Sequence, residues 1–194
     1  MGRIILITGG CRSGKSAYGL ARGVELAGPR LFVATCPPLD DEMRERITRH
    51  RMARDESMWD TCEAVPHAVP LANTVSLPDL AKVLEGAGKY NVVLVDCLTL
   101  WIGNMMHDRE VRGAELLTEQ DVAKKCRGLL EAARGNSGTF IFVTNETGMG
   151  IIPDNPSARL FRDLSGRCNQ VMAVGADEVV LMTCGLPLKI KGWL

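Results

Sequence analysis

The sequence has 194 residues, of which 46% are hydrophobic and 24% are charged, a size and composition that predict one compact soluble domain over residues 1–194. The 23 Lys and Arg residues balance the 23 Asp and Glu residues, which excludes bulk attraction to nucleic acid or to an anionic membrane. Seven cysteines without a CxxC pair argue against a disulfide framework and a zinc site, and no apolar run is long enough for a membrane span, so we expect a cytoplasmic protein.

Short apolar runs alternate with helix-like stretches along the chain. Strands are predicted at Arg3–Thr8, Leu31–Thr35, Asn91–Asp96, Thr139–Thr144 and Glu178–Thr183. The clearest helices are predicted at Ser16–Ala27, Asp40–Arg54, Glu115–Arg134 and Ser157–Val174. Pro66–Pro78 is predicted to be a surface connection, and Pro187–Lys191 an antiparallel strand at the sheet edge. This alternation predicts an α/β fold with a mainly parallel sheet and helices on both faces.

The segment after the first predicted strand, Gly9-x-x-x-x-Gly14-Lys15-Ser16, matches the P-loop pattern and opens a predicted helix. Glycines let the backbone wrap closely around phosphate, so that N–H groups and the helix N-terminus face the anion. Lys15 then places a charge at the outer phosphates, and the Ser16 hydroxyl can bind Mg²⁺. The alternative is a glycine turn that binds nothing, but pattern and context together predict a nucleoside triphosphate with Mg²⁺. The predicted binding residues here are Gly9, Gly10, Cys11, Arg12, Ser13, Gly14, Lys15 and Ser16.

The predicted helix Asp40–Arg54 separates its charges, with acidic residues in the first turn and arginines after it. Arg46 and Arg54 lie four residues either side of His50, so an unbroken helix would place all three on one face. Nearby positive charge favours the neutral, nucleophilic imidazole, and arginines can hold the phosphate oxygens that it attacks. From the spacing alone, the favoured interpretation is instead a solvated arginine-rich face with an incidental histidine.

The apolar run Val92–Val95 ends at Asp96, where a buried central strand would present the carboxylate beside the P-loop. There it would be a second Mg²⁺ ligand, after Ser16. The alternative is a cap for the helix predicted to begin near Leu98. The presence of the P-loop favours the metal ligand.

Seven segments carry a wider resemblance: TGGCRSGKS, VATCPPLDDEMRERITRHR, WDTCE, VLVDCLTLW, VTNETGMGIIPDN, ARLFRDLSGRCNQ and GLPLKIKG. With these segments in this order, nearly the whole chain resembles the bifunctional adenosylcobinamide kinase / adenosylcobinamide-phosphate guanylyltransferase family of cobalamin biosynthesis. The resemblance implies a RecA-like P-loop fold and two reactions. The first is phosphorylation of the aminopropanol hydroxyl of adenosylcobinamide by ATP or GTP. The second is transfer of GMP from GTP to adenosylcobinamide phosphate.

The resemblance also implies a GMP-histidine intermediate at His50, which reverses the interpretation drawn from the spacing. Glu63 would accept guanine N–H groups, although it could equally be an exposed strand residue. The implied partners are the two corrinoid substrates and neighbouring subunits of a homo-oligomer, which is a trimer in the family. Further contacts with GTP are implied at Ala34, Thr35, Cys36, Arg51, Met52, Ala53, Arg54, Glu63 and Asp96.

The block Thr144–Pro153 follows a predicted strand at the ligand-facing edge of the sheet. Its glycines would let the backbone approach the corrinoid or the nucleotide, with Asn145 and Glu146 adding polar contacts. An ordinary glycine-rich loop is an equal alternative. A polar stripe follows on the next predicted helix and would face solvent, substrate or a neighbouring subunit. Its members are Arg159, Arg162, Gly166 and Asn169.

Two other functions remain open from the residues themselves. One is a monofunctional P-loop kinase that acts on another small molecule, and the other is a nucleotide-dependent regulatory module without transfer chemistry. They differ in what they require of His50. A kinase alone needs no covalent nucleotide on the enzyme, because phosphoryl transfer can proceed by positioning and charge neutralisation.

Overall fold

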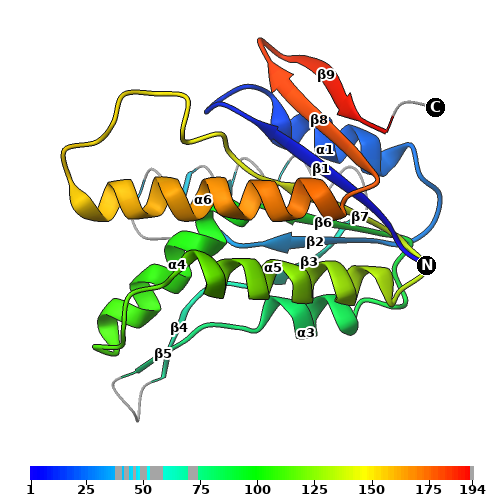
Figure 1. Cartoon of the computed structure of the whole chain (residues 1–194). Helices are drawn as coiled ribbons and strands as arrows, with labels where there is room; N and C mark the ends of the chain where they lie inside the picture. The colour runs from blue at the N-terminus through cyan, green and yellow to red at the C-terminus, as the bar shows by residue number, and fades with distance from the viewer. Residues whose placement is uncertain are drawn as a thin grey trace.

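The computed structural model describes residues 1–37, 41, 44–45, 47–48, 52, 59–69 and 74–192. In this part of the chain a seven-stranded sheet has the order β3-β2-β6-β7-β1-β8-β9 (Figure 1). Its strands are β1 (Arg3–Gly9), β2 (Arg30–Ala34), β3 (Trp59–Glu63), β6 (Val92–Asp96), β7 (Thr139–Val143), β8 (Glu178–Thr183) and β9 (Leu186–Lys191). All neighbouring pairs are parallel except β8 and β9. The α/β class and the antiparallel edge strand are therefore confirmed.

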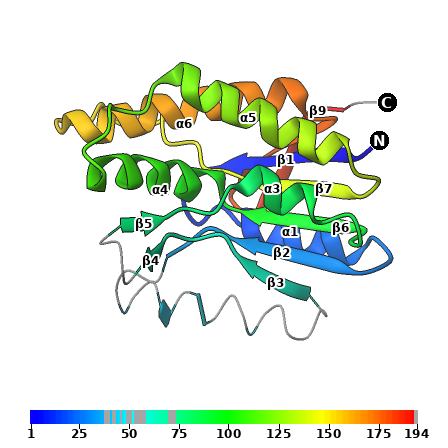
Figure 2. The same cartoon turned by 90° about the horizontal axis from the view of Figure 1, so that it is seen from below.

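Helices cover both faces of the sheet, as predicted (Figures 1 and 2). The described helices are α1 (Lys15–Val24), α3 (Leu80–Glu85), α4 (Leu98–Val111), α5 (Glu119–Arg134) and α6 (Pro156–Gly175). α1 packs on one face, where alternate strand residues such as Ile5 and Ile7 are buried. The other four helices pack on the opposite face against Ile4 and Leu6. The two-residue alternation along each strand thus fills two separate cores.

Three of the described helices, α3, α5 and α6, begin at residues whose side chains cap them. The Thr118 hydroxyl accepts a hydrogen bond from the Asp121 backbone N–H, and the Asp121 carboxylate accepts one from the Thr118 backbone N–H, a capping box at the start of α5. Asn155 accepts hydrogen bonds from two backbone N–H groups at the start of α6, and Pro156 occupies the first turn. α1 lies close to the sheet because Gly19 has no side chain: a Cβ there would be 2.9 Å from Leu94 Cδ1.

One prediction about secondary structure is wrong in part, and two observed elements, β3 and α3, are not predicted. The predicted surface connection Pro66–Pro78 is wrong in part, since it contains two antiparallel strands, β4 (His67–Val69) and β5 (Thr74–Ser76). The sequence pattern does not predict β3, because an edge strand needs few buried residues and most of its side chains are partly or fully exposed. It also does not predict α3, which is too short for a helical period. Most of the predicted helix Asp40–Arg54 lies outside the described residues.

A network of hydrogen bonds joins several elements at the amino edge of the sheet, the edge where the parallel strands begin. Arg134, the last residue of α5, donates to both carboxylate oxygens of Asp177, each at 2.7 Å. It also donates to the carbonyl oxygens of Gly2 and Gly175, at 2.8 and 2.9 Å. Asp177 accepts the Ile4 backbone N–H at 2.7 Å. The hydrogen bonds from Arg134 lower the pKa of Asp177. We call these five residues the amino-edge lock.

None of the helices in the described ranges combines the length and the apolar character that a membrane-crossing segment needs.

Candidate functional site

The P-loop pattern forms a tight turn between the carboxyl end of β1 and the start of α1. Gly9, Arg12 and Gly14 have positive φ angles of 149°, 56° and 93°. A Cβ on Gly9 would lie 2.3 Å from the Met182 carbonyl oxygen of β8, so this position requires glycine. A Cβ on Gly14 would lie 3.5 Å from Gly185 Cα in the β8–β9 turn. The loop is therefore braced by the C-terminal hairpin at both of its ends.

The N-terminus of α1 is electrostatically suited to an anion. Its N-cap, Gly14, supplies no side-chain cap, and its first turn contains no acidic residue. The first backbone N–H groups of a helix have no intrahelical partner and carry a partial positive charge. A phosphate group placed here would accept hydrogen bonds from those N–H groups.

The Lys15 ammonium group lies over the loop that precedes it. Its side chain is only 7% exposed, and Nζ donates to the Gly10 carbonyl oxygen at 2.6 Å. The Ser13 hydroxyl lies 3.4 Å from the same nitrogen. A buried ammonium group needs such partners. A phosphate bound inside the loop would compete for this charge at short range.

The residues at the carboxyl ends of three neighbouring strands form one row. Ala34 of β2 is in register with Glu63 of β3 on one side and with Asp96 of β6 on the other. Parallel strands in register present such residues on the same face. Asp96 lies two residues after Leu94, which is buried on the α1 side of the sheet, so its carboxylate lies on that side as well.

The role of Asp96 as a second Mg²⁺ ligand beside the P-loop stays a prediction. β6 is not next to the P-loop strand, because β7 lies between them. The alternative, in which Asp96 caps the following helix, is not observed, because the N-cap of α4 is Cys97, which makes no side-chain cap. Within the described part of the chain, no side-chain or backbone donor bonds to the Asp96 carboxylate, which is half-buried. Its oxygens are thus available to a ligand.

Thr35 has a structural task at the end of β2. Its hydroxyl bonds to both the N–H and the carbonyl oxygen of Cys97, each at 2.7 Å. The Asn104 side chain donates to the Thr35 carbonyl oxygen at 2.9 Å. Thr35 is fully buried, whereas Ala34 and Cys36 are half-buried. Burial and the negative charge of Asp96 raise the pKa of Cys97 to about 12.

Polar residues that the sequence does not predict to lie together form a cluster beside the P-loop strand. It comprises Thr8, Thr99, Thr144, Glu146 and Asn169, which come from β1, α4, the turn after β7 and α6. Glu146 Oε1 accepts from the Thr8 hydroxyl at 2.5 Å and from the Asn169 amide at 3.0 Å. Thr144 Oγ1 donates to Asn169 Oδ1 at 2.7 Å and lies 3.2 Å from Thr99 Oγ1. The signal available in the sequence is the position of Thr8 and Thr144 at the ends of predicted strands.

Asn169 is therefore a buried member of this cluster, although the predicted polar stripe gives no sign of that. The stripe was predicted to face solvent, substrate or a subunit, but Asn169 is 9% exposed and bonds inward. Arg159 donates to the carbonyl oxygens of Pro153 and Asp154, which ties the start of α6 to the preceding loop.

The predicted nucleophile and its neighbours fall outside the described residues. These are His50, Arg51, Ala53 and Arg54. Met52, the described member of this group, is 65% exposed. The role assigned to His50 stays a prediction.

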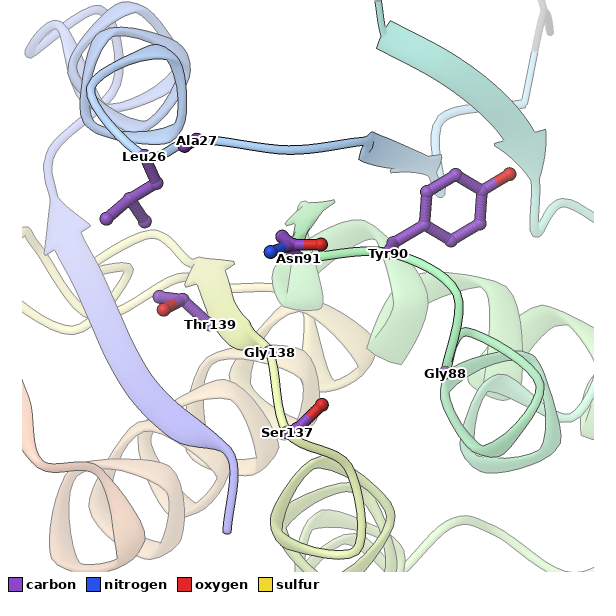
Figure 3. A pocket seen from close by; sticks show the side chains of 8 residues that line it. All are labelled: Leu26, Ala27, Gly88, Tyr90, Asn91, Ser137, Gly138 and Thr139. Atoms are coloured by element: carbon purple, nitrogen blue, oxygen red, sulfur yellow. The ribbon is translucent and has the colours of Figure 1, made fainter.

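Two hollows in the surface lie away from the row of predicted residues. One, of about 240 Å³, lies where the chain enters β2, β6 and β7, at the amino edge of the sheet, and is shown in Figure 3. Its lining includes Leu26, Tyr90, Asn91 and Thr139. The other, of about 580 Å³, lies between α3, α4 and α5. Neither contains a residue of the P-loop.

The sequence from residue 5 to residue 190 matches the CobU family, described as cobinamide kinase / cobinamide phosphate guanyltransferase. The chain belongs to this family. Its P-loop strand and the strand that ends at Asp96 both lie inside the matched region. The mainly parallel α/β sheet expected for the family is observed, with β7 between those two strands.

Curated relatives match over almost their full length. The bifunctional adenosylcobalamin biosynthesis protein CobU of Escherichia coli is 36% identical, over 97% of this chain and 99% of its own. CobU of Salmonella typhimurium is 37% identical, with the same coverage. CobP of Pseudomonas aeruginosa is 35% identical, over 96% of each chain. A solved KaiC-like protein of Pyrococcus horikoshii has a TM-score of 0.47 and 16% identity, over 92% of this chain and 71% of its own.

Proposed function

We propose that this chain catalyses two consecutive reactions of cobalamin biosynthesis. It phosphorylates adenosylcobinamide with ATP or GTP, and it then transfers GMP from GTP to the phosphate it has made, giving adenosylcobinamide-GDP. The family match over residues 5–190 carries this proposal. The P-loop geometry supports it, because both reactions begin with a bound nucleoside triphosphate.

In this proposal the loop from Gly9 to Ser16 holds the triphosphate, and Lys15 turns from the Gly10 carbonyl oxygen to the outer phosphates. Ser16 and Asp96 would hold Mg²⁺, which would neutralise charge on the phosphates during transfer. The residues fit such an ion, since Mg²⁺ is usually bound by one or two carboxylates plus substrate phosphates. In keeping with that mode of binding, the described residues contain no cluster of three acidic, Cys or His side chains that would form an all-protein cage.

For the second reaction, we assign His50 as the nucleophile. Its imidazole nitrogen attacks the α-phosphorus of GTP, a P–N bond forms, and the P–O bond to pyrophosphate breaks with its electron pair leaving on pyrophosphate. A phosphate oxygen of the corrinoid then attacks the same phosphorus and displaces the imidazole. Arg51 and Arg54 would neutralise the phosphate charge, and Glu63 would accept guanine N–H groups. Nucleotide contacts at Ala34, Thr35, Cys36, Met52 and Ala53 complete the proposed site.

The test is covalent labelling by GTP that carries a radioactive α-phosphate. The protein is incubated with the nucleotide and Mg²⁺, denatured, and examined for acid-labile, base-stable label. We expect label on the wild type and on His107→Ala, whose histidine is exposed on α4, and none on His50→Ala. Label that persists in His50→Ala would remove His50 from the mechanism.

The same experiment separates the alternative functions. Good GTP binding without any label would favour a monofunctional kinase or a regulatory module. A cytoplasmic location and assembly into a homo-oligomer, predicted to be a trimer, are further parts of the proposal. Size-exclusion chromatography with light scattering would measure the oligomeric state.

A further inference from the structure

Glu146 lies directly against the first glycine of the P-loop. Its backbone N–H donates to the Gly9 carbonyl oxygen at 3.0 Å, so the turn after β7 is tied to the end of β1. Of the three carboxylates considered at this edge, Glu63 and Asp96 belong to β3 and β6, which are not neighbours of β1. Of these three residues, Glu146 is thus the one whose backbone is hydrogen-bonded to the phosphate-binding loop.

The two oxygens of the Glu146 carboxylate have different environments. Oε1 accepts hydrogen bonds from the Thr8 hydroxyl and the Asn169 amide, at 2.5 and 3.0 Å. No described residue donates to Oε2. Asn169 is itself held by the Thr144 hydroxyl at 2.7 Å. One oxygen is therefore fixed by two donors, while the other remains open on a side chain that is only half-buried.

The next residue gives a second indication that a polar ligand meets this turn. Thr147 Oγ1 is buried and has no hydrogen-bond partner. Most buried polar atoms in folded proteins are hydrogen-bonded, so such an atom calls for an explanation. A polar group of a substrate bound beside Glu146 would supply the missing bond.

We infer that Glu146 is the proton acceptor of the kinase reaction, an inference that rests on the proposed function. The substrate hydroxyl oxygen attacks the γ-phosphorus, and an O–P bond forms. The bond from that phosphorus to the bridging oxygen breaks, with its electron pair leaving on the nucleoside diphosphate. The hydroxyl proton passes to Glu146 Oε2. Thr8 and Asn169 are positioning residues, because they fix the carboxylate through Oε1.

The second reaction has no such requirement. Its attacking group is the phosphate of adenosylcobinamide phosphate, which is ionised at neutral pH and has no hydroxyl proton to lose. Attack of His50 on GTP also needs no carboxylate, because the neutral imidazole is the nucleophile. Removing the basicity of Glu146 should therefore impair the kinase reaction and spare covalent labelling of the protein.

Glu146→Gln is the variant that separates these effects. The glutamine carbonyl oxygen can still accept from Thr8 and Asn169, so the contacts around Oε1 are kept. The open oxygen is replaced by an amide group, which cannot take a proton at neutral pH. Glu131→Gln is the matched control, since Glu131 is exposed on α5, one turn from the amino-edge lock.

The experiment measures kcat and the nucleotide KM for phosphorylation of adenosylcobinamide, together with α-phosphate labelling from GTP. We expect Glu146→Gln to lower kcat by about 100- to 10,000-fold, the range for loss of a general base. Nucleotide KM and labelling should stay within about twofold of wild type, since proton transfer is not part of binding. Glu131→Gln should match wild type in every measurement.

Two results would overturn the inference alone. The first is a Glu146→Gln enzyme whose kcat stays within about threefold of wild type. The second is a loss of nucleotide binding and labelling in parallel with kcat, which would make Glu146 a brace for the P-loop. A wild-type protein that does not phosphorylate adenosylcobinamide would overturn the proposed function, and this inference with it.

Discussion

The two edges of the central sheet treat their charged groups in opposite ways. At the amino edge, the Arg134 guanidinium group bonds to both oxygens of Asp177 and to two carbonyl oxygens. At the carboxyl edge, Asp96 receives no hydrogen bond from any described residue, and Glu146 uses only one of its two oxygens. The Asp177 carboxylate at the amino edge bonds to protein donors through both of its oxygens, whereas the carboxylates at the other edge do not.

This difference indicates that the amino edge serves the stability of the fold and the carboxyl edge serves the chemistry of the site. Groups whose hydrogen bonds are complete hold strand and helix ends together, and they have nothing left for a ligand. Groups with open oxygens contribute little to folding and can meet a metal ion, a phosphate or a hydroxyl proton. Substitutions at the carboxyl edge should lower activity without unfolding the protein. Substitutions at the amino edge should destabilise the fold without changing the activity of the folded protein.

The largest expected effect is that of Lys15→Ala. Phosphorylation of adenosylcobinamide should fall by about 1,000-fold or more, because the transition state loses the charge that the P-loop places on the outer phosphates. Product is measured by chromatography of the corrinoids. The free energy of unfolding should change by less than about 1 kcal/mol, since the ammonium group leaves a loop and not the core. Lys82→Ala, an exposed lysine on α3, is the control, and full activity in Lys15→Ala would contradict the P-loop assignment.

The converse substitution is Arg134→Ala at the amino edge. It removes four hydrogen bonds, two of them to a carboxylate, and should lower the free energy of unfolding by about 1 to 3 kcal/mol. Urea unfolding followed by circular dichroism measures this, with Arg127→Ala, an exposed arginine of the same helix, as the control. The activity of the folded fraction should be unchanged. A loss of catalysis in the folded fraction would contradict the claim that the amino edge contributes to stability alone.

The smallest expected effect is the pH dependence of the amino-edge lock. The pKa of Asp177 is lowered in the folded protein, so its carboxylate stabilises the fold above its unfolded-state pKa. This stabilisation is lost as pH falls through the lower folded-state pKa. At pH 7, Asp177→Asn should cost about 1 kcal/mol, a modest value because the side chain is 41% exposed.

The measurement for this prediction is urea unfolding of both proteins at a series of pH values. The difference in unfolding free energy should shrink as acid is added. A difference that stays constant down to the folded-state pKa would show that Asp177 acts without its charge.

The sequence predicts the parts of the fold that have a strong local signal. Buried strands such as β1 and β8 each contain four consecutive apolar residues, Ile4–Ile7 and Val179–Met182, and the P-loop glycines specify a turn by their backbone freedom. β3 lacks such a signal because it lies at an edge and Trp59 is its one buried residue. The short strands β4 and β5 lie in a segment whose prolines indicate a loop.

The candidate site divides in the same way. Gly9 to Ser16 and Asp96 are found from pattern and strand position, since each follows a recognisable apolar run. The polar cluster is not found, because Thr8, Glu146 and Asn169 are brought together by strand order and by packing of α6. Asn169 in particular looks like one member of a polar stripe, and only the tertiary structure turns it inward.

The contact between the P-loop and the C-terminal hairpin has a consequence for synthesis of the protein. The Met182 carbonyl oxygen and the Gly185 turn face the two glycines that bound the loop. While β8 and β9 are still in the ribosome, β1 lacks its neighbour β8, and the β8–β9 hairpin does not yet restrict the conformation of the P-loop. A growing polypeptide should thus acquire its affinity for nucleotide only after the β8–β9 hairpin has formed beside the loop.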